Sequence, residues 1–383
     1  MQAGLGHILT ILMAIYLDHN ATTPLKPLVA EVMTQAMAQP GNPSSIHSFG
    51  RSARKHLEDA RFQVAAAINA EPEDIVFTSG ATEADNAALR HSGMASVLFA
   101  ETEHDAILQS REDAIRLPVD AQGLVDLDAL TKALADAPKP AMVSVMLANN
   151  ETGVIQPLSD IAAIVRAQEG AYLHCDAAQA LGKMPVDAKA LGADLISLSA
   201  HKCGGPSGVG ALVTTTRLEP GKWQFGGGQE KRRRPGTENL IGIIGFGKAA
   251  QLAVDELEAF TSLAIWRDAM ERHILDAVPA VQIMGQEVKR LPNTSNLVLP
   301  GVPAQTQVMA LDLAGFAVSS GSACSSGKVD PSHVILAMTG DPALSACALR
   351  VSLGWDTTEA DIDAFTKAYI RMAQKQRAKL TAA

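Results

Sequence analysis

The sequence Asp194-Leu195-Ile196-Ser197-Leu198-Ser199-Ala200-His201-Lys202, followed by the glycine-rich run 204–210, decides the fold of this chain. Its apolar first half predicts a buried strand, and the glycines predict a tight turn after it. Burial favours the neutral amine of a lysine, which is the nucleophilic form that a Schiff-base lysine needs. Lys202 could instead extend its side chain to water. This stretch alone leaves both interpretations open.

Similar short apolar runs recur along the first two-thirds of the chain and alternate with alanine-rich amphipathic segments. We expect strands at 74–78, 95–99, 142–147, 171–175, 194–198 and 210–214, and helices at about 50–70, 82–91, 126–137 and 157–169. Continuous apolar strands separated by helices predict an α/β fold, with a mainly parallel sheet covered on both faces.

The pattern changes after about residue 238, which predicts a second and smaller domain. Residues 238–278 are expected to be mostly helical. Strands are expected at 294–299, 316–319 and 349–353, and helices at 303–313, 331–338 and 357–377. We therefore predict a large domain over 18–262 and a small α+β domain over 263–383. The first strand, within 1–17, is expected to pack with the small domain.

The N-terminal apolar segment, Ile8 to Leu17, does not resemble a targeting signal. No Lys or Arg precedes it, and it is too short to span a membrane. Residues 1–12 are interpreted as an extension or a misplaced start, and a cytoplasmic protein without a membrane anchor is expected.

Composition excludes several classes of protein. The formal net charge of −9 argues against a nucleic-acid binder. The basic run Lys231 to Arg234 is therefore interpreted as a solvated loop that supplies positive potential. The four cysteines have no CxxC spacing, which indicates thiols in a reducing compartment. No sequence pattern suggests a metal site.

Asp176 follows the strand expected at 171–175 and precedes Lys202 by 26 residues, about one short crossover. Parallel neighbouring strands bring both side chains to the carboxyl edge of the sheet, where ligands of open α/β sheets bind. A lysine and a carboxylate in this place suit pyridoxal phosphate, because the carboxylate keeps the ring nitrogen protonated. A simple Asp–Lys ion pair remains the alternative.

The segment Thr78 to Asn86 follows another strand and opens a helix. Gly80 permits a tight turn, and Thr82 is expected to cap the helix with Asp85 three residues later. The free N–H groups of a helix N-terminus bind phosphate. Together with Asp176 and Lys202, this turn predicts a phosphorylated cofactor.

These motifs give the chain a resemblance to the group I cysteine desulfurases, the NifS/IscS type of the class V aminotransferase superfamily. The matching stretches are Tyr16–Pro24, Gly41–Ser45, Thr78–Asn86, Thr102–His104, Asn149–Gly153, His174–Gln179, Ser199–Lys202, Arg234–Asn239 and Ser319–Cys324. The resemblance implies the fold-type I architecture of pyridoxal phosphate enzymes, with a seven-stranded, mainly parallel sheet in the large domain.

The resemblance also implies a role for each matching residue. Lys202 would hold pyridoxal phosphate and move protons, Asp176 would pair with the ring nitrogen, and Gln179 would bind the phenolic oxygen. His104 would stack on the ring and serve in acid–base steps. The remaining residues would bind phosphate (Ala81, Thr82, Ser199, His201, and Thr237 from the neighbouring subunit of a homodimer) or the substrate (Asn150 and Arg350). Taken singly, His104 could be a surface residue, Gln179 and Asn150 ordinary polar groups, and Arg350 a structural ion-pair partner.

Cys324 lies in a small, polar, glycine-rich segment, where a cysteine that only fills a core is seldom found. The resemblance implies that its thiolate attacks the sulfur of L-cysteine. This would leave a persulfide on Cys324, release alanine, and supply a protein acceptor such as an iron–sulfur scaffold. Cys175 and Cys347 are expected to be buried, and Cys203 is given no catalytic role. A selenocysteine lyase, another class V lyase or aminotransferase, and a non-catalytic sulfur-relay protein are the alternatives.

Overall fold

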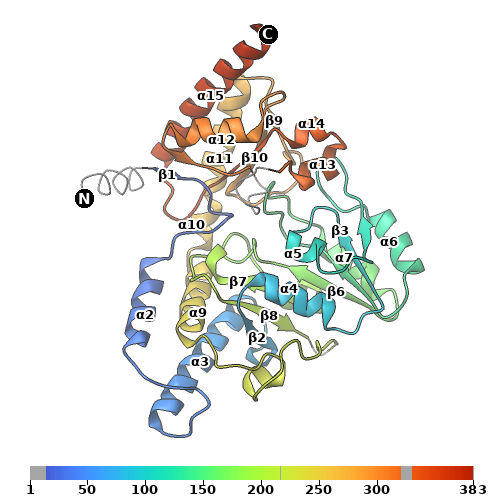
Figure 1. Cartoon of the computed structure of the whole chain (residues 1–383), viewed down its shortest axis with the longest axis vertical. Helices are drawn as coiled ribbons and strands as arrows, with labels where there is room; N and C mark the ends of the chain where they lie inside the picture. Colours follow the sequence, from blue (N-terminus) through green and yellow to red (C-terminus); the bar gives the residue numbers. More distant parts are fainter. Residues whose placement is uncertain (1–13, 216, 321–329, 383) are drawn as a thin grey trace.

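The computed structural model describes residues 14–215, 217–320 and 330–382. A seven-stranded sheet forms its centre, as the resemblance implied (Figure 1). From edge to edge the strands are β2 (Ile75–Thr78), β8 (Gly210–Thr214), β7 (Leu195–Ser199), β6 (Ala171–Asp176), β5 (Ala141–Ser144), β3 (Ser96–Ala100) and β4 (Ile115–Leu117). Within this sheet only β8 runs in the direction opposite to the other strands. The sheet is therefore mainly parallel.

Alternate residues of the strands enter two different cores, because successive side chains of a strand point to opposite faces. In β3, Leu98 joins the core packed under α2, α3, α6, α7 and α9, whereas Val97 and Phe99 join the core under α4 and α5. The sheet is thus covered by helices on both faces. These helices are α2 (Pro27–Met37), α3 (Ser48–Ala67), α4 (Ala81–Arg90), α5 (Asp105–Leu108), α6 (Leu127–Asp136), α7 (Leu158–Arg166), α8 (Ala188–Leu191) and α9 (Leu240–Asp255).

A second layer contains a three-stranded antiparallel sheet with its own core. It has the order β12 (Ala348–Ser352), β10 (Thr294–Val298), β9 (Gln282–Ile283). Its helices are α11 (Leu263–Ala277), α12 (Ala304–Asp312), α13 (His333–Thr339), α14 (Pro342–Ser345) and α15 (Glu359–Ala382). Figure 1 shows this layer above the large sheet, with α15 ending at the C-terminus. No helix among the described residues is long and apolar enough to cross a membrane.

The chain passes between the two layers twice, once before α2 and once after α9. β1 (Ile15–Tyr16) pairs in parallel with β11 (Phe316–Ala317), beside the three-stranded sheet, before the chain enters α2. The second crossing runs from α9 through α10 (Leu257–Thr261) to α11. Lys26 Nζ lies 2.6 Å from Glu256 Oε2, so an ion pair joins the two crossings.

Short helical turns complete the fold: η1 (Pro72–Asp74), η2 (Ala200–Lys202) and η3 (Gln229–Arg232). The η2 turn directly follows β7 and places Lys202 at the carboxyl edge of the sheet. In η3, Glu230, Lys231 and Arg232 all have positive φ angles. Positive φ angles are unfavourable for residues other than glycine. Two hydrogen bonds from the Arg61 guanidinium to the buried Glu230 carboxylate stabilise this backbone conformation.

Candidate active site

A cavity of about 460 Å³ lies at the carboxyl ends of the central strands, where β12 approaches the large sheet. Nearly all of the predicted site residues line it. They are Ala81, Thr82, His104, Asn150, Asp176, Gln179, Ser199, His201, Lys202 and Arg350. Residues spread over 270 positions of sequence therefore share one hollow.

The predicted proximity of Asp176 and Lys202 to one sheet edge is confirmed. Asp176 is the last residue of β6, which pairs in parallel with β7, and Lys202 lies in the turn after β7. The Lys202 amine is not extended to water: Nζ donates to the carbonyl oxygens of Asn20, at 2.6 Å, and Ala21, at 2.8 Å. These acceptors keep the amine beside the cavity.

Three buried carboxyl groups lie beneath the cavity and respond differently to burial. Burial raises the pKa of Asp85 and Glu103 well above their usual range, and the nearby Asp176 raises both further. Burial also raises the pKa of Asp176, but the N–H of Ala178, then His104 and Lys202, oppose that rise. Asp176 is thus the carboxyl group best supported as an anion; it lines the cavity, as does Asp85.

The turn before α4 forms one end of the cavity. Gly80 is the N-cap, and no side chain caps this helix end. The expected cap by Thr82 is therefore wrong: Thr82 already lies in the first turn, and Glu83 reaches back to the Ser79 N–H at 2.7 Å. The N–H groups of the first turn, which lack intrahelical partners, can bind an anion.

His201 and Ser199 lie beside this helix end, on the cavity wall. Burial, and then the charge of Lys202, lower the pKa of His201 to about 4, so its imidazole is neutral near pH 7. Nδ1 of His201 lies 3.1 Å from the Thr22 hydroxyl. A neutral imidazole and a hydroxyl can both hydrogen-bond a phosphate without adding a permanent charge.

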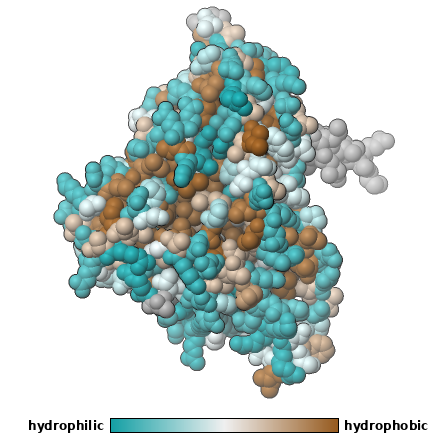
Figure 2. All heavy atoms as spheres, turned by 180° about the vertical axis from the view of Figure 1, so that it is seen from behind, coloured by the Kyte–Doolittle hydropathy of each residue, from teal (hydrophilic) through white to brown (hydrophobic). Residues whose placement is uncertain are grey.

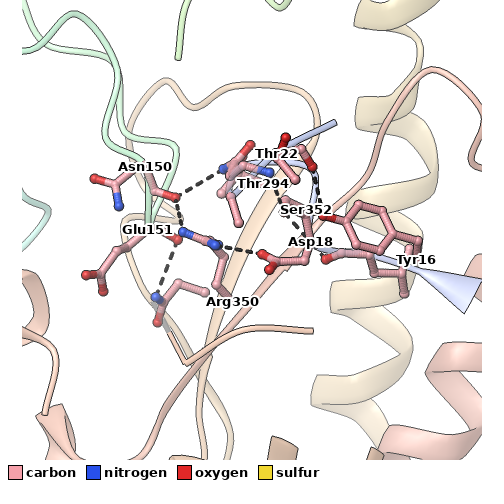
Figure 3. A network of polar contacts seen from close by, with 12 residues as sticks. Tyr16, Asp18, Thr22, Asn150, Glu151, Thr294, Arg350 and Ser352 are labelled. Carbon is pink, nitrogen blue, oxygen red and sulfur yellow. Dashed lines mark hydrogen bonds and ion pairs between the residues drawn. The ribbon is translucent and has the colours of Figure 1, made fainter. Parts of the chain in front are cut away.

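Arg350 marks the opposite end of the cavity. Its Nη2 donates to Asp18 Oδ1 at 2.6 Å, and Nη1 donates to the Asn150 carbonyl at 3.1 Å (Figure 3). Arg350 Nε and the buried Asn150 Oδ1 have no hydrogen-bond partner among the described residues. A buried guanidinium with an unused N–H fits the carboxylate of a small substrate.

Sequence reasoning gave no role to Asn20 or Lys183, which the structure places between the two ends. The Asn20 carbonyl accepts hydrogen bonds from Lys202 and from Gln179. Its side-chain oxygen accepts one from Lys183 at 2.7 Å. Asn20 lies within the matching stretch Tyr16–Pro24, and that stretch was the available signal for it. Lys183, four residues after Gln179, lies outside every matching stretch.

The cysteines other than Cys324 are buried, as expected. Burial raises the pKa of Cys175 well above its usual range and that of Cys203 to about 11, so both remain thiols. Cys203 Sγ contacts the Ala200 carbonyl and does not line the main cavity. Cys324 lies outside the described residues. Thr237 is exposed and is not on the cavity wall.

The polar groups of the cavity match the chemistry of pyridoxal phosphate. A lysine amine suits its aldehyde, a buried carboxylate its ring nitrogen, and an uncapped helix N-terminus its phosphate. Arg350 remains at the other end for an amino-acid carboxylate. The residues present therefore fit both this cofactor and an amino-acid substrate.

Known proteins resemble the chain over nearly its whole length. The family Aminotransferase class-V matches residues 15–365. "Cysteine desulfurase IscS" of Dictyoglomus turgidum is 39% identical, with 95% of each chain covered. "Putative cysteine desulfurase IscS 1" of Bacillus subtilis is 40% identical over 92% of this chain and 97% of its own. The solved structure of a NifS-like protein from Rickettsia africae superposes with a TM-score of 0.88 at 35% identity, covering 94% of this chain and 99% of that one.

Proposed function

This chain belongs to the class V aminotransferase family, and we propose that it is a pyridoxal phosphate-dependent cysteine desulfurase that converts L-cysteine to L-alanine. The observation that carries this proposal is the single cavity that joins Lys202, Asp176 and Arg350. One end of it suits the cofactor, and the other suits the substrate carboxylate. The Dictyoglomus turgidum relative named above is a cysteine desulfurase by name.

Residues of the sheet edge would hold the cofactor. Lys202 would bind it covalently, Asp176 would pair with the ring nitrogen, and Gln179 would face the phenolic oxygen. When bound, the cofactor withdraws electrons from the α-carbon of an amino acid. His104 lines the same wall and would stack on the ring. The phosphate would lie at the uncapped start of α4, with contacts from Ala81, Thr82, Ser199 and His201.

The same residues would position the substrate and move its protons. Arg350 would bind the substrate carboxylate through its planar guanidinium, with Asn150 beside it. Lys202 Nζ, set by the Asn20 and Ala21 carbonyls, would take the α-proton. His104 would serve in the later acid–base steps.

Cys324 would receive the sulfur. Its thiolate attacks the substrate sulfur, a sulfur–sulfur bond forms, and the carbon–sulfur bond breaks with its electron pair left on carbon. Protonation of that carbon completes alanine, and Cys324 keeps a persulfide. The described residues on either side of 321–329 support this assignment. The Ser319 backbone pairs with that of Arg350, and Ser332 Oγ donates to Glu151 Oε2 at 2.5 Å. The described residues that flank positions 321–329 are therefore held beside Arg350 and Glu151.

We expect the enzyme to act as a homodimer in which Thr237 reaches the phosphate of the neighbouring subunit. The exposure of Thr237 and its position away from its own subunit's cavity support this role. Exposed apolar side chains are available for an interface: Ile46 is 91% exposed, and Phe49 and Phe225 are also exposed. Figure 2 shows an apolar tip at the lower end of the molecule, where Figure 1 places the connection between α2 and α3.

The sulfur would pass to a protein acceptor, such as an iron–sulfur scaffold or a related sulfur carrier. A reducing compartment, the cytoplasm, fits this chemistry. The free, buried thiols of Cys175, Cys203 and Cys347 agree with it.

The direct experiment compares the purified wild type with Cys324→Ala. The wild type should show a visible absorption band that borohydride bleaches, and it should release sulfide and alanine from cysteine. Cys324→Ala should keep the band and its change on adding cysteine, but release no sulfide. Cys203→Ala is the matched control and should remain active. A colourless wild type would exclude the cofactor, and sulfide production by Cys324→Ala would exclude the nucleophile.

A further inference from the structure

Lys183 has a buried amine that the proposed reaction does not use. It follows Gln179 by one helical turn's spacing and is only 2% exposed. Its Nζ donates to two neutral oxygens, Asn20 Oδ1 at 2.7 Å and Gln179 Oε1 at 2.5 Å. Burying a lysine amine against neutral partners is costly in either protonation state, which raises the question of what these two contacts do.

The surrounding carbonyls fix the orientation of both amides that Lys183 contacts. The Gln179 amide nitrogen donates to the Asn20 carbonyl at 2.9 Å, and the Asn20 amide nitrogen donates to the Asn150 carbonyl at 3.1 Å. A carbonyl oxygen can only accept. The oxygen atoms of both side chains must therefore face the Lys183 amine, and the assignment does not depend on how an amide is drawn.

This arrangement leaves one unused polar group on the Gln179 side chain. Its oxygen is bound by Lys183, and one amide hydrogen is bound by Asn20. The second amide hydrogen is free, and Gln179 lines the main cavity. Because its oxygen is turned toward Lys183, Gln179 offers the second amide hydrogen, a donor, to a ligand there.

We propose that Lys183 is a positioning residue that locks the Gln179 amide so that it donates to the phenolic oxygen of the cofactor. The inference rests on the proposed function, because it takes the cofactor in that cavity as its starting point. Without Lys183, the Gln179 oxygen loses its donor, and the amide can turn to present an acceptor instead.

The locked donor has a chemical consequence at Lys202. The phenolic oxygen, as an anion, accepts a hydrogen bond from the protonated nitrogen that would link Lys202 to the cofactor. A second donor, the Gln179 amide, stabilises the same anion and weakens its bond to that nitrogen. Gln179 therefore lowers the pKa of the nitrogen that would link Lys202 to the cofactor. Loss of one such hydrogen bond should raise the pH of that deprotonation by about one unit.

Other charged groups near Lys183 set the background for this effect. Burial, followed by the charges of Lys202 and Arg350, lowers the pKa of Lys183 well below its usual range. Cys203, His19 and His201 are the further titratable neighbours. The pKa of each histidine is lowered to about 4 and that of Cys203 is raised to about 11, so none of the three changes charge between pH 6 and 9.

A spectroscopic pH titration of the cofactor-loaded protein tests the proposal without relying on turnover. The visible band is followed from pH 6 to 9 in the wild type, Lys183→Met, Gln179→Ala and the double variant. Lys183→Met and Gln179→Ala should each raise the apparent pKa of the band by about one unit. The double variant should match Gln179→Ala. An unchanged midpoint in Lys183→Met, or fully additive shifts in the double variant, would overturn the proposal.

Two further variants separate this effect from loss of folding. Lys26→Met removes another buried lysine, one that pairs with Glu256 rather than with Gln179, and it should leave the midpoint unchanged. Lys183→Arg keeps the donor and should restore a midpoint near that of the wild type, even where Lys183→Met unfolds. A midpoint in Lys183→Arg as high as in Gln179→Ala would also count against the proposal. A wild type without the band would instead contradict the proposed function.

Discussion

The two ends of the cavity are built in different ways. At the cofactor end, Asp176 and Lys202 extend from β6 and β7, two parallel strands paired directly by backbone hydrogen bonds. At the substrate end, Arg350 is held by side-chain and carbonyl contacts to Asp18 and Asn150, and the three come from distant parts of the sequence. The first end is fixed by sheet register, whereas the second depends on side chains that meet only when the whole chain has folded.

This difference teaches how each end should respond to substitution. A side chain removed from a strand end leaves the strands and their neighbours in place. A side chain removed from the Arg350 group leaves buried polar partners unpaired, and it can shift the residues beside it. The predictions below use this contrast, beginning with the largest expected effect.

Replacing Lys202 by alanine should have the largest effect on the reaction. The β6 and β7 pairing does not depend on this side chain, so Asp176 and Gln179 should keep their places. The rate of alanine formation should fall by about 10²–10⁴-fold or more, because proton transfer at this amine is lost. Reverse-phase separation of the products measures the rate. A decrease of less than tenfold would show that the cofactor end does not depend on Lys202.

Replacing Arg350 by lysine should act at the substrate end alone. The guanidinium geometry is lost, and charge-assisted hydrogen bonds of this kind contribute about 2 kcal/mol or more. We expect kcat/KM for cysteine to fall about 30-fold, mainly through KM, while the visible band stays as in the wild type. Steady-state kinetics together with absorption spectra separate the two ends. A bleached band would mean that the two ends are not independent.

Asp18→Asn should have a weaker effect at the same end. It retains an oxygen that can accept from Arg350 Nη2, but it removes the charge of a pair that solvent partly reaches. Partly exposed ion pairs contribute up to about 1 kcal/mol, so KM should rise by no more than about fivefold. A KM increase as large as that of Arg350→Lys would show that Asp18 itself contacts the substrate.

His174→Gln should have the smallest effect on activity and should appear only in stability at low pH. His174 is buried in β6 beneath the cavity, between the hydroxyls of Ser144 and Ser197. Burial lowers its pKa from 6.5 to about 3, so the folded protein keeps it neutral while the unfolded chain takes up a proton below pH 6.5. Its contribution to stability is therefore complete above pH 6.5 and is lost as the pH falls.

The pH dependence of the free energy of unfolding distinguishes the variant from the wild type. As the pH falls below 6.5, His174 lowers the free energy of unfolding of the wild type by up to about 1.4 kcal/mol per pH unit, whereas glutamine does not titrate. Urea denaturation at pH 7.5, 6.0 and 5.0 should thus show a shallower decline for the variant. Parallel declines would mean that His174 is already protonated in the folded protein.

The cofactor end could be predicted from the sequence because its signals are local. Asp176 and Lys202 each follow an apolar run, and parallel pairing brings the ends of such runs together. Strand β4 (Ile115–Leu117) was missed, since three residues at the sheet edge, only one of them buried, carry too little hydrophobic pattern. The Thr82 cap was also wrong, because Gly80 is the N-cap of α4 and Thr82 already lies in its first turn.

The substrate end and Lys183 could be predicted only in part. The resemblance identified Arg350, but the partners that orient it, Asp18 and the Asn150 carbonyl, depend on contacts across 332 and 200 positions of sequence. No periodicity encodes such contacts. The contact of Lys183 with Gln179 is local. The orientation of the Gln179 amide, however, depends on the Asn20 carbonyl, which lies 159 positions earlier in the sequence.

The ion pair between Lys26 and Glu256 constrains how the two layers can move. Each residue lies on one of the two covalent connections between the large and the small sheet, and their 2.6 Å contact holds these connections side by side. Because a side-chain ion pair joins the two covalent connections, a displacement of one connection is passed directly to the other, and the small sheet that carries Arg350 is coupled to the large sheet through both connections together.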